Sequence, residues 1–174
     1  MHETMVNTRE QTERVERQNT RQACVSIVAD LLAMEISGPG EEIKIYLNSP
    51  ESVPYHIFAI IDVIQQLKCP VSTVAFGMCG GASTLLLAAG TKGRRTAMPH
   101  SRILIHQPMG GAMGSSYEVK IQATELSRNM RLMCKMYSKF TGLDEDLLRE
   151  EIDRDNFMSP AKCVEMGLID FVLD

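Results

Sequence analysis

The fold of this chain is decided by residues 71–108, VSTVAFGMCGGASTLLLAAGTKGRRTAMPHSRILIHQP. Residues 71–76 are β-branched and aromatic and are bounded by Pro70 and Gly77, which predicts a short buried strand. Residues 82–89 predict a helix that ends at Gly90. A tight turn joins the two and offers backbone N–H groups together with the positive end of a helix dipole. Acyl-transfer enzymes use this arrangement to hold an oxyanion.

The turn has no nucleophile of its own. A serine hydrolase built on it would place its serine within the turn, where this sequence has Gly80 and Gly81. The nearest hydroxyl, Ser83, follows Gly81 by two residues and lies about 200° further round the helix, so we expect it to face elsewhere. Cys79 has no neighbouring His or Lys to lower its thiol pKa and is typical of a small buried apolar residue.

Two β-α units follow one another along the chain. The apolar positions of residues 22–37 have helical spacing, and Gly38-Pro39-Gly40 ends that helix. A strand over residues 43–47 then leads through the turn Asn48-Ser49-Pro50 into a second helix. Because the 71–90 stretch repeats this order, the sequence predicts an α/β fold with parallel strands and helices outside them.

The second half of the chain is mostly helical. Ser115 to Glu118 has the spacing of a capping box and opens a long helix that reaches about Phe140. This helix has more apolar positions than one narrow stripe needs, so we expect it to pack against another subunit. We also predict a strand over residues 102–106, a helix over 144–152, a helix beginning at Ser159-Pro160, and a terminal strand over 168–173.

Composition limits the class of protein. Residues 1–20 form a polar amino-terminal arm, of which residues 1–18 predict a mobile arm or an exposed helix, whereas residues 21–174 predict a single domain. The net charge of −4 and the dispersed basic residues argue against nucleic acid, and apolar runs too short for a bilayer argue against a membrane span. Five widely spaced cysteines suggest a reducing compartment without disulfides or a zinc site. No metal or cofactor motif is present, so we expect neither.

Two residues are candidates for chemistry. His106 ends a predicted strand beside Gln107-Pro108 and could emerge into a cleft as a general base, or it could be a structural histidine. Asp155 could orient His106 as the third member of a triad, or it could be an exposed loop acid. The glycine-rich segment 107–116 could pair with an extended peptide at a sheet edge, or it could be a flexible connection.

From about Gln22 to Asp174 the chain resembles the Clp protease proteolytic-subunit family. The resemblance is carried by the motifs YLNSP, VSTVAFG, LLLAAGTKGRRTAMPHSRILIHQPMGG, RDNFMS and GLID. It implies a ClpP/crotonase-like fold of stacked β-β-α or β-α units with a long protruding handle helix. The family's nucleophilic serine stands 25 residues before the HQP histidine, and here that position is Gly81. The family's aspartate falls on Asp155.

Other site roles are implied by the same resemblance. The oxyanion donors would be the amides of Ser52 and Ala82, although Glu51-Ser52 replaces two glycines of the family pattern. Arg154 resembles the residue that ties two rings together. The resemblance also implies that Gly110 and Gly111 pair with a substrate strand. Tyr46 and Leu173 would be remnants of an unfoldase-docking pocket, in which Lys44, Gln66 and Thr96 replace aromatic groups of the family.

The resemblance therefore implies a non-catalytic subunit of the R type known from cyanobacteria and plastids. Its expected partners are catalytic ClpP-type subunits in a heptameric ring and a stacked double ring, a Clp ATPase unfoldase acting through the complex, and extended polypeptide. The expected location is the plastid stroma or the cyanobacterial cytoplasm. Two alternatives stay open: an active serine-type endopeptidase with Ser83 or Cys79 as replacement nucleophile, and a crotonase-like acyl-CoA enzyme.

Overall fold

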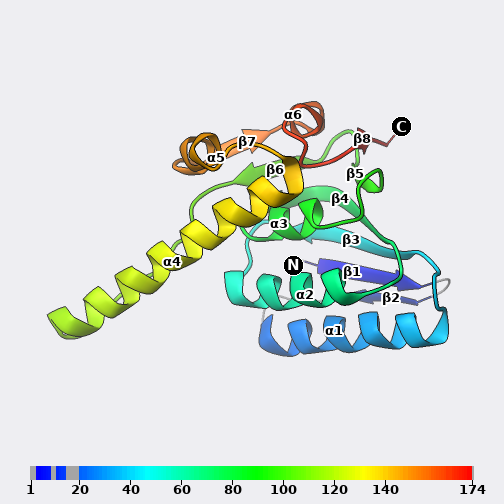
Figure 1. Ribbon diagram of the computed structural model, residues 1–174, viewed down its shortest axis with the longest axis horizontal. Helices are drawn as coiled ribbons and strands as arrows, with labels where there is room; N and C mark the ends of the chain where they lie inside the picture. The colour runs from blue at the N-terminus through cyan, green and yellow to red at the C-terminus, as the bar shows by residue number, and fades with distance from the viewer. Residues whose placement is uncertain (1–2, 9–10, 15–19, 174) are drawn as a thin grey trace.

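The computed structural model describes residues 3–8, 11–14 and 20–173, as a mixed α/β domain from which one long helix projects (Figure 1). The fold predicted from the sequence is therefore confirmed. The strands are β1 (Glu3–Thr8), β2 (Gln11–Arg14), β3 (Ile43–Ser49), β4 (Val71–Gly80), β5 (Arg95–Ala97), β6 (Arg102–Ile105), β7 (Asn156–Met158) and β8 (Phe171–Val172). The helices are α1 (Thr20–Ser37), α2 (Pro54–Gln66), α3 (Ser83–Ala88), α4 (Ser116–Thr141), α5 (Glu145–Ile152) and α6 (Pro160–Glu165).

Strand β4 is the centre of the sheet, whose main order is β2-β1-β3-β4-β5-β8. Its first half pairs in parallel with β3 on one side and β5 on the other, as expected of a strand buried on both faces. The strand continues past the predicted end at residue 76, and its last residues pair with β6 instead. Because β4 changes partners just before it ends, the turn that follows lies beside the end of β6.

The two strands next to the site are antiparallel. Ile105 of β6 pairs with Asn156 of β7, so the register continued by one residue sets His106 opposite Asp155. The sequence did not predict β7, because its three residues lie in a polar loop without alternation. It also missed β5, another strand of three residues.

The amino-terminal segment differs from the expectation. We expected a mobile arm or an exposed helix over residues 1–18, whereas residues 3–8 and 11–14 form strands β1 and β2. Strand β1 is antiparallel to both β2 and β3 and so covers the edge of β3. The remainder of that expectation falls on residues outside the described part of the chain.

The helices cover the sheet in sequence order. Helix α1 packs on α2, α2 on α3 and α3 on α4, while α5 and α6 lie at the β6–β7 end (Figure 1). The first half of α4 projects from this body, and only its second half carries buried residues. Its predicted capping box is confirmed, since Ser115 and Glu118 exchange side-chain to backbone hydrogen bonds. In the described ranges no helix is both long and apolar enough to cross a membrane.

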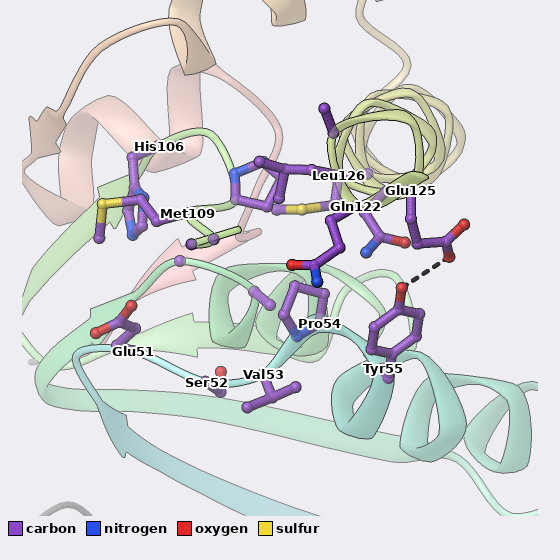
Figure 2. Close-up of a pocket in the computed structure, with 18 of the residues that line it drawn as sticks. Glu51, Ser52, Val53, Pro54, Tyr55, His106, Met109, Gln122, Glu125 and Leu126 are labelled. Atoms are coloured by element: carbon purple, nitrogen blue, oxygen red, sulfur yellow. Dashed lines mark hydrogen bonds between the residues drawn. The ribbon is translucent and has the colours of Figure 1, made fainter. Parts of the chain in front are cut away.

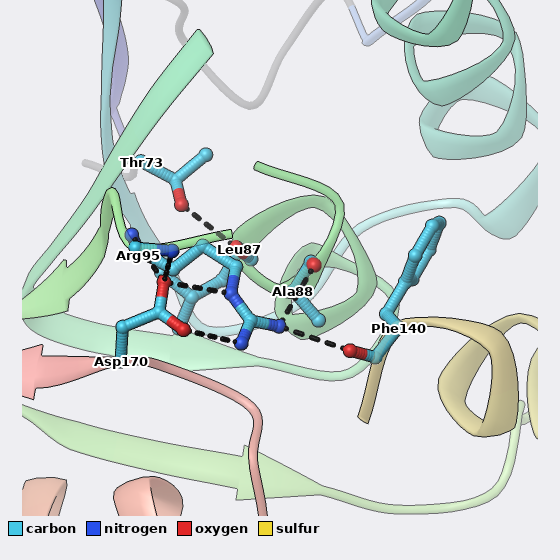
Figure 3. Close-up of polar contacts among 7 residues, drawn as sticks. Thr73, Leu87, Ala88, Arg95, Phe140 and Asp170 are labelled. Atoms are coloured by element: carbon cyan, nitrogen blue, oxygen red, sulfur yellow. Dashed lines mark hydrogen bonds and ion pairs between the residues drawn. The ribbon is translucent and has the colours of Figure 1, made fainter. Parts of the chain in front are cut away.

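One buried ion pair joins the far side of the sheet to two helix ends (Figure 3). The Arg95 guanidinium donates to both carboxylate oxygens of Asp170, at 2.6 and 3.0 Å. It also donates to the carbonyl oxygens of Ala88 in α3 and Phe140 in α4. Arg95 is 3% exposed, so this network fixes the carboxyl ends of α3 and α4 against β5 and β8.

Candidate active site

The turn between β4 and α3 contains two glycines that the backbone requires. A Cβ on Gly80 would lie 2.2 Å from the carbonyl oxygen of Pro50, so no side chain fits there. Gly81 has a φ of +56°, in the left-handed region that strains residues with a side chain. A left-handed residue in a sharp strand-to-helix turn is also the geometry that exposes a nucleophile. The turn therefore keeps the backbone of a nucleophile elbow while its side chain is absent.

His106 faces this glycine. A Cβ built on Gly81 would lie 3.0 Å from Nε2 of His106. The other ring nitrogen, Nδ1, is 2.8 Å from the carbonyl oxygen of Gln107 and so carries the proton that it donates. Nε2 is consequently an acceptor directed at the position where a serine side chain would begin. This is the orientation required of a general base.

Asp155 lies near His106 without bonding to it. The β6–β7 register sets the two residues opposite each other, but Nδ1 of His106 is bonded to Gln107. Asp155 is exposed, and within the described residues it makes no hydrogen bond or ion pair. Arg154 beside it is exposed in the same way. The structure thus brings Gly81 and His106 together and leaves Asp155 close by but unengaged.

The loop after β3 forms the other side of the turn. Oγ of Ser52 is 2.5 Å from Oγ of Ser83, so the first turn of α3 is fastened to this loop. Ser83 is 2% exposed, which agrees with the expectation that it would not occupy the nucleophile position. Ala82 is the residue preceding α3, and among the described residues its backbone N–H has no hydrogen-bond acceptor. An amide without an acceptor at this place can receive an anionic oxygen.

The long helix α4 reaches the turn from behind. The hydroxyl of Tyr137 contacts the hydroxyl of Thr84 and donates to the carbonyl oxygen of Gly81, at 3.4 Å, while Thr84 donates to the same oxygen at 2.8 Å. Tyr137 is 1% exposed, and burial raises the pKa of its phenol, so it stays neutral. Sequence reasoning treated Tyr137 only as an apolar position of the helix.

A cavity of about 650 Å³ opens in front of Gly81 and His106. Figure 2 shows Gln122 and Leu126 of α4 facing Val53 and Pro54 across it, with His106 and Met109 at one end. Tyr55 donates to Glu125 at the opposite end, at 2.7 Å. Ser52, Ala82, Gly110 and Gly111 also line the cavity. Its volume falls in the range of ligand pockets.

Cys79 is the weakest of the predicted candidates. The residue is fully buried in β4, and burial raises the pKa of its thiol well above the ordinary value. A thiol that stays protonated is a poor nucleophile. All five cysteines are free and buried, and in the searched part of the chain no group of His, Cys, Asp and Glu is arranged to hold a metal ion.

The predicted docking remnants lie away from the cavity. Tyr46 is on β3, with its ring edge-on to Phe76 at 6.4 Å. Leu173 follows β8 and donates its backbone N–H to Ala97. Strands β4 and β5 separate the two residues in the sheet, so within one chain they form no common pocket.

The chain is similar to known proteins over nearly its whole length. The family model described as Clp protease matches residues 4–174, which includes most of the hairpin that precedes the segment of resemblance noted above. The chain is 43% identical over 157 residues to ATP-dependent Clp protease proteolytic subunit 1 of Prochlorococcus marinus strain MIT 9312, and the match covers 90% of this chain and 80% of that protein. It is 41% identical over 149 residues to the chloroplastic proteolytic subunit 4 of Arabidopsis thaliana, covering 86% of this chain and 51% of that protein. It is also 40% identical to a proteolytic subunit of Bdellovibrio bacteriovorus, covering 89% of this chain and 74% of that protein.

Proposed function

The chain belongs to the Clp protease family, and from this premise we propose that it is a non-catalytic subunit of an ATP-dependent Clp protease. One observation carries the proposal. The position that faces Nε2 of His106 is Gly81, which has no atom that could attack a peptide carbonyl. Without an attacking oxygen no acyl-enzyme can form, however well the base and the oxyanion-binding amides are placed.

The altered loop supports the same proposal. The amide assigned to oxyanion binding belongs to Ser52, whose side chain is bonded to Ser83. Ser52 and the preceding Glu51 stand where the family pattern has two glycines. Two separate parts of the catalytic apparatus therefore depart from an active peptidase, whereas the parts that shape the domain are kept.

The first alternative is an active peptidase with a replacement nucleophile. Ser83 is buried and bonded to Ser52, and Cys79 is buried with a raised thiol pKa. Among the described residues no hydrogen bond joins either group to His106. The match to the Clp protease family over residues 4–174 argues against the other alternative, a crotonase-like acyl-CoA enzyme.

We further propose that the chain works in a mixed ring with catalytic subunits of its family and holds extended polypeptide in its cavity without cleaving it. The partners that follow are those catalytic subunits, a stacked second ring joined near Arg154, and an ATP-driven unfoldase acting through the complex. The relatives from cyanobacteria and a chloroplast favour a plastid stroma or a cyanobacterial cytoplasm.

Covalent labelling tests the central proposal. The purified chain is treated with a fluorophosphonate probe, and every Ser and Cys is then checked for an adduct by peptide mass spectrometry. We expect no adduct, while a catalytic subunit treated in parallel is labelled on its serine. An adduct on Ser83, Cys79 or any other residue at a rate comparable to the catalytic subunit would overturn the proposal. Native mass spectrometry of the chain mixed with catalytic subunits tests the mixed ring.

A further inference from the structure

The carbonyl oxygen of Gly81 is held by more hydrogen bonds than the turn needs. It accepts from the Thr84 N–H at 3.2 Å, from the Thr84 hydroxyl at 2.8 Å and from the Tyr137 hydroxyl at 3.4 Å. The two hydroxyls also contact each other. The Thr84 N–H closes the first turn of α3, whereas the hydroxyls are additional donors, and both belong to side chains that are no more than 1% exposed. Two buried hydroxyls, from α3 and α4, therefore converge on one carbonyl oxygen.

This carbonyl shares a rigid peptide unit with the Ala82 amide. A trans peptide is planar, and its C=O and N–H point in opposite directions. Because the hydroxyls of Thr84 and Tyr137 hold the Gly81 oxygen, the Ala82 N–H is directed away from those two side chains. Among the described residues this N–H has no acceptor, and Ala82 lines the cavity. The two hydroxyls thus set the direction of an unused donor in the cavity wall.

His106 supplies an unused acceptor at the same place. It is 8% exposed and lines the cavity, and its Nε2 faces the Cβ position of Gly81. Within the described part of the chain Nε2 has no hydrogen-bond partner, yet it is not one of the unpartnered atoms that are sealed from solvent. The site therefore offers one donor and one acceptor. The main chain of a polypeptide carries one of each per residue, so it can match both whatever its side chains are.

We propose that Thr84 and Tyr137 are positioning residues, which hold the Gly81–Ala82 peptide so that the Ala82 N–H donates to a main-chain carbonyl oxygen of polypeptide in the cavity. The inference rests on the proposed function, because it takes the occupant of the cavity to be a polypeptide. A donor that is fixed before the ligand arrives needs no reorganisation on binding. Without the hydroxyls the peptide unit can turn, and the donor is no longer aimed at the ligand in every molecule.

Amide NMR of the full-length, ¹⁵N-labelled chain tests the inference. The probe is the capped peptide acetyl-Ala-Leu-Ala-Leu-Ala-amide. In the wild type the Ala82 amide proton should move downfield on binding, because it gains an acceptor. In Thr84→Val, which removes the hydroxyl at nearly constant size, that movement should fall by half or more and the peptide should bind about fivefold more weakly. Thr84→Ser keeps the hydroxyl and should behave like the wild type. Tyr137→Phe is the second variant and should act in the same direction as Thr84→Val.

The matched control is Thr73→Val. It removes a fully buried hydroxyl that donates to the Leu87 carbonyl, near the other end of α3, at 2.7 Å. This control should lower stability and leave the Ala82 response and the affinity unchanged. A merely structural role would make Thr84→Val and Thr73→Val alike in both readouts, and that result would overturn the inference. Peptide binding without an Ala82 shift in the wild type would also overturn it, and it alone. Failure of the peptide to bind at all would overturn the polypeptide-holding function and the inference with it.

Discussion

In the proposed function a single residue, Gly81, determines what this site can do. Its backbone has the left-handed conformation of an exposed nucleophile, and its missing Cβ would lie 3.0 Å from Nε2 of His106. The base is therefore directed at an empty position. The replacement of the family's serine by Gly81 could be predicted from the sequence, because the family pattern places that serine 25 residues before the histidine that matches His106. The orientation of Gly81 toward Nε2 could not, because it depends on β4 and β6 lying side by side.

Gly81→Ser should restore weak hydrolysis. The new hydroxyl would be placed beside Nε2 of His106, with the Ala82 amide available for the oxyanion, so a base and part of an oxyanion hole are already present. Because His106 Nδ1 is bonded to Gln107 rather than to Asp155, we expect a rate well below that of a catalytic subunit. The measurement is fluorophosphonate labelling and peptide turnover in an assembled ring.

Gly81→Ala is the control for that prediction. It introduces the same Cβ and the same backbone strain, about 1 kcal/mol, but no hydroxyl. Both variants should lose similar thermal stability, and only Gly81→Ser should become labelled. If Gly81→Ser stays unlabelled in a well-assembled ring, the Glu51-Ser52 loop rather than the missing hydroxyl limits activity. Labelling of Gly81→Ala would show that the nucleophile is some other residue.

Asp170→Asn should destabilise the fold in a pH-dependent way. Burial alone would raise the pKa of Asp170, but the hydrogen bonds and charge of Arg95, with the Gly93 amide, outweigh it and hold the pKa below its usual value. A lowered folded-state pKa contributes stability that is complete above the unfolded pKa of about 4 and is lost as the pH falls through the folded pKa.

The wild-type chain and Asp170→Asn are compared by urea unfolding at pH 7 and at pH 3. At pH 7 the variant leaves the buried Arg95 without its counter-charge, so its free energy of unfolding should be about 3 kcal/mol lower than that of the wild type. Toward pH 3 the difference should shrink, because the wild-type carboxylate starts to take up a proton. If the wild type and Asp170→Asn differ in free energy of unfolding by the same amount at both pH values, the Asp170 charge contributes nothing to stability. Asp146→Asn, on the exposed surface of α5, is the control.

Among the elements, helix α4 combines two different halves. Its amino-terminal half projects with exposed residues, and its carboxyl-terminal half packs under the β4–α3 turn through Met133 and Tyr137. The cap, the length and the end of this helix follow from local sequence signals, so they could be predicted. The burial of Asn129 has a sequence signal as well, since it lies at helical spacing between Leu126 and Met133. What could not be predicted is that no partner among the described residues reaches its Oδ1, because that depends on segments distant in sequence.

Ser115→Ala should fray the first turns of α4 without unfolding the domain. Ser115 caps the helix by accepting from the Glu118 amide, and the adjoining residues are exposed. Loss of such a cap should accelerate amide hydrogen exchange over residues 118–122 by roughly fivefold and leave exchange around Met133 unchanged. Ser127→Ala, in the middle of the same helix, is the control. Equal protection in the wild type and Ser115→Ala would contradict the capping role.

Tyr137→Phe should loosen the connection between α4 and the turn. The variant removes the hydroxyl that contacts Thr84 and the Gly81 carbonyl in a buried site, and we expect a loss of about 1–2 kcal/mol in the free energy of unfolding. Tyr55→Phe removes a hydroxyl that is bonded to Glu125 at an exposed site and should cost far less. Urea unfolding of both variants compares the two. Equal losses would mean that the buried hydroxyl adds nothing specific.

At the scale of the whole molecule, apolar side chains remain exposed on two helices. Tyr117, Val119 and Ile121 are 73%, 38% and 52% exposed on the projecting half of α4. On α1, Val25, Leu32 and Ile36 are exposed along one face, at spacings of seven and four residues. Exposed apolar side chains of this kind are expected at contacts with other subunits of the proposed ring.

Ile121→Lys should weaken assembly and leave the fold of the single chain intact. The side chain contributes nothing to the domain core, so the thermal transition of the monomer should hardly change. A buried charge in a subunit interface is costly, and sedimentation velocity should therefore show a shift toward smaller species. Thr124→Lys adds the same charge to the same helix without removing an apolar group. Similar sedimentation of the wild type and Ile121→Lys would remove α4 from the proposed interface.

The layered α/β arrangement could be predicted from the sequence because strand and helix periodicities alternate clearly from residue 22 to residue 90. The hairpin of β1 and β2 could not. Its residues are rich in Glu, Gln, Thr and Arg and lack an alternating apolar pattern, and the pairing with β3 is supplied by backbone groups of a distant segment.

The left-handed turn at Gly81 also has a genetic consequence. Some glycine codons differ from a serine codon by a single base, and the backbone conformation, the facing imidazole and the neighbouring amide would already be in position for the new side chain. The proposed loss of catalysis at this residue would therefore be easier to reverse by mutation than a deletion of the turn. If the subunit is non-catalytic as proposed, a lineage in which Gly81 has one of those codons would need a single nucleotide change to place a serine opposite His106.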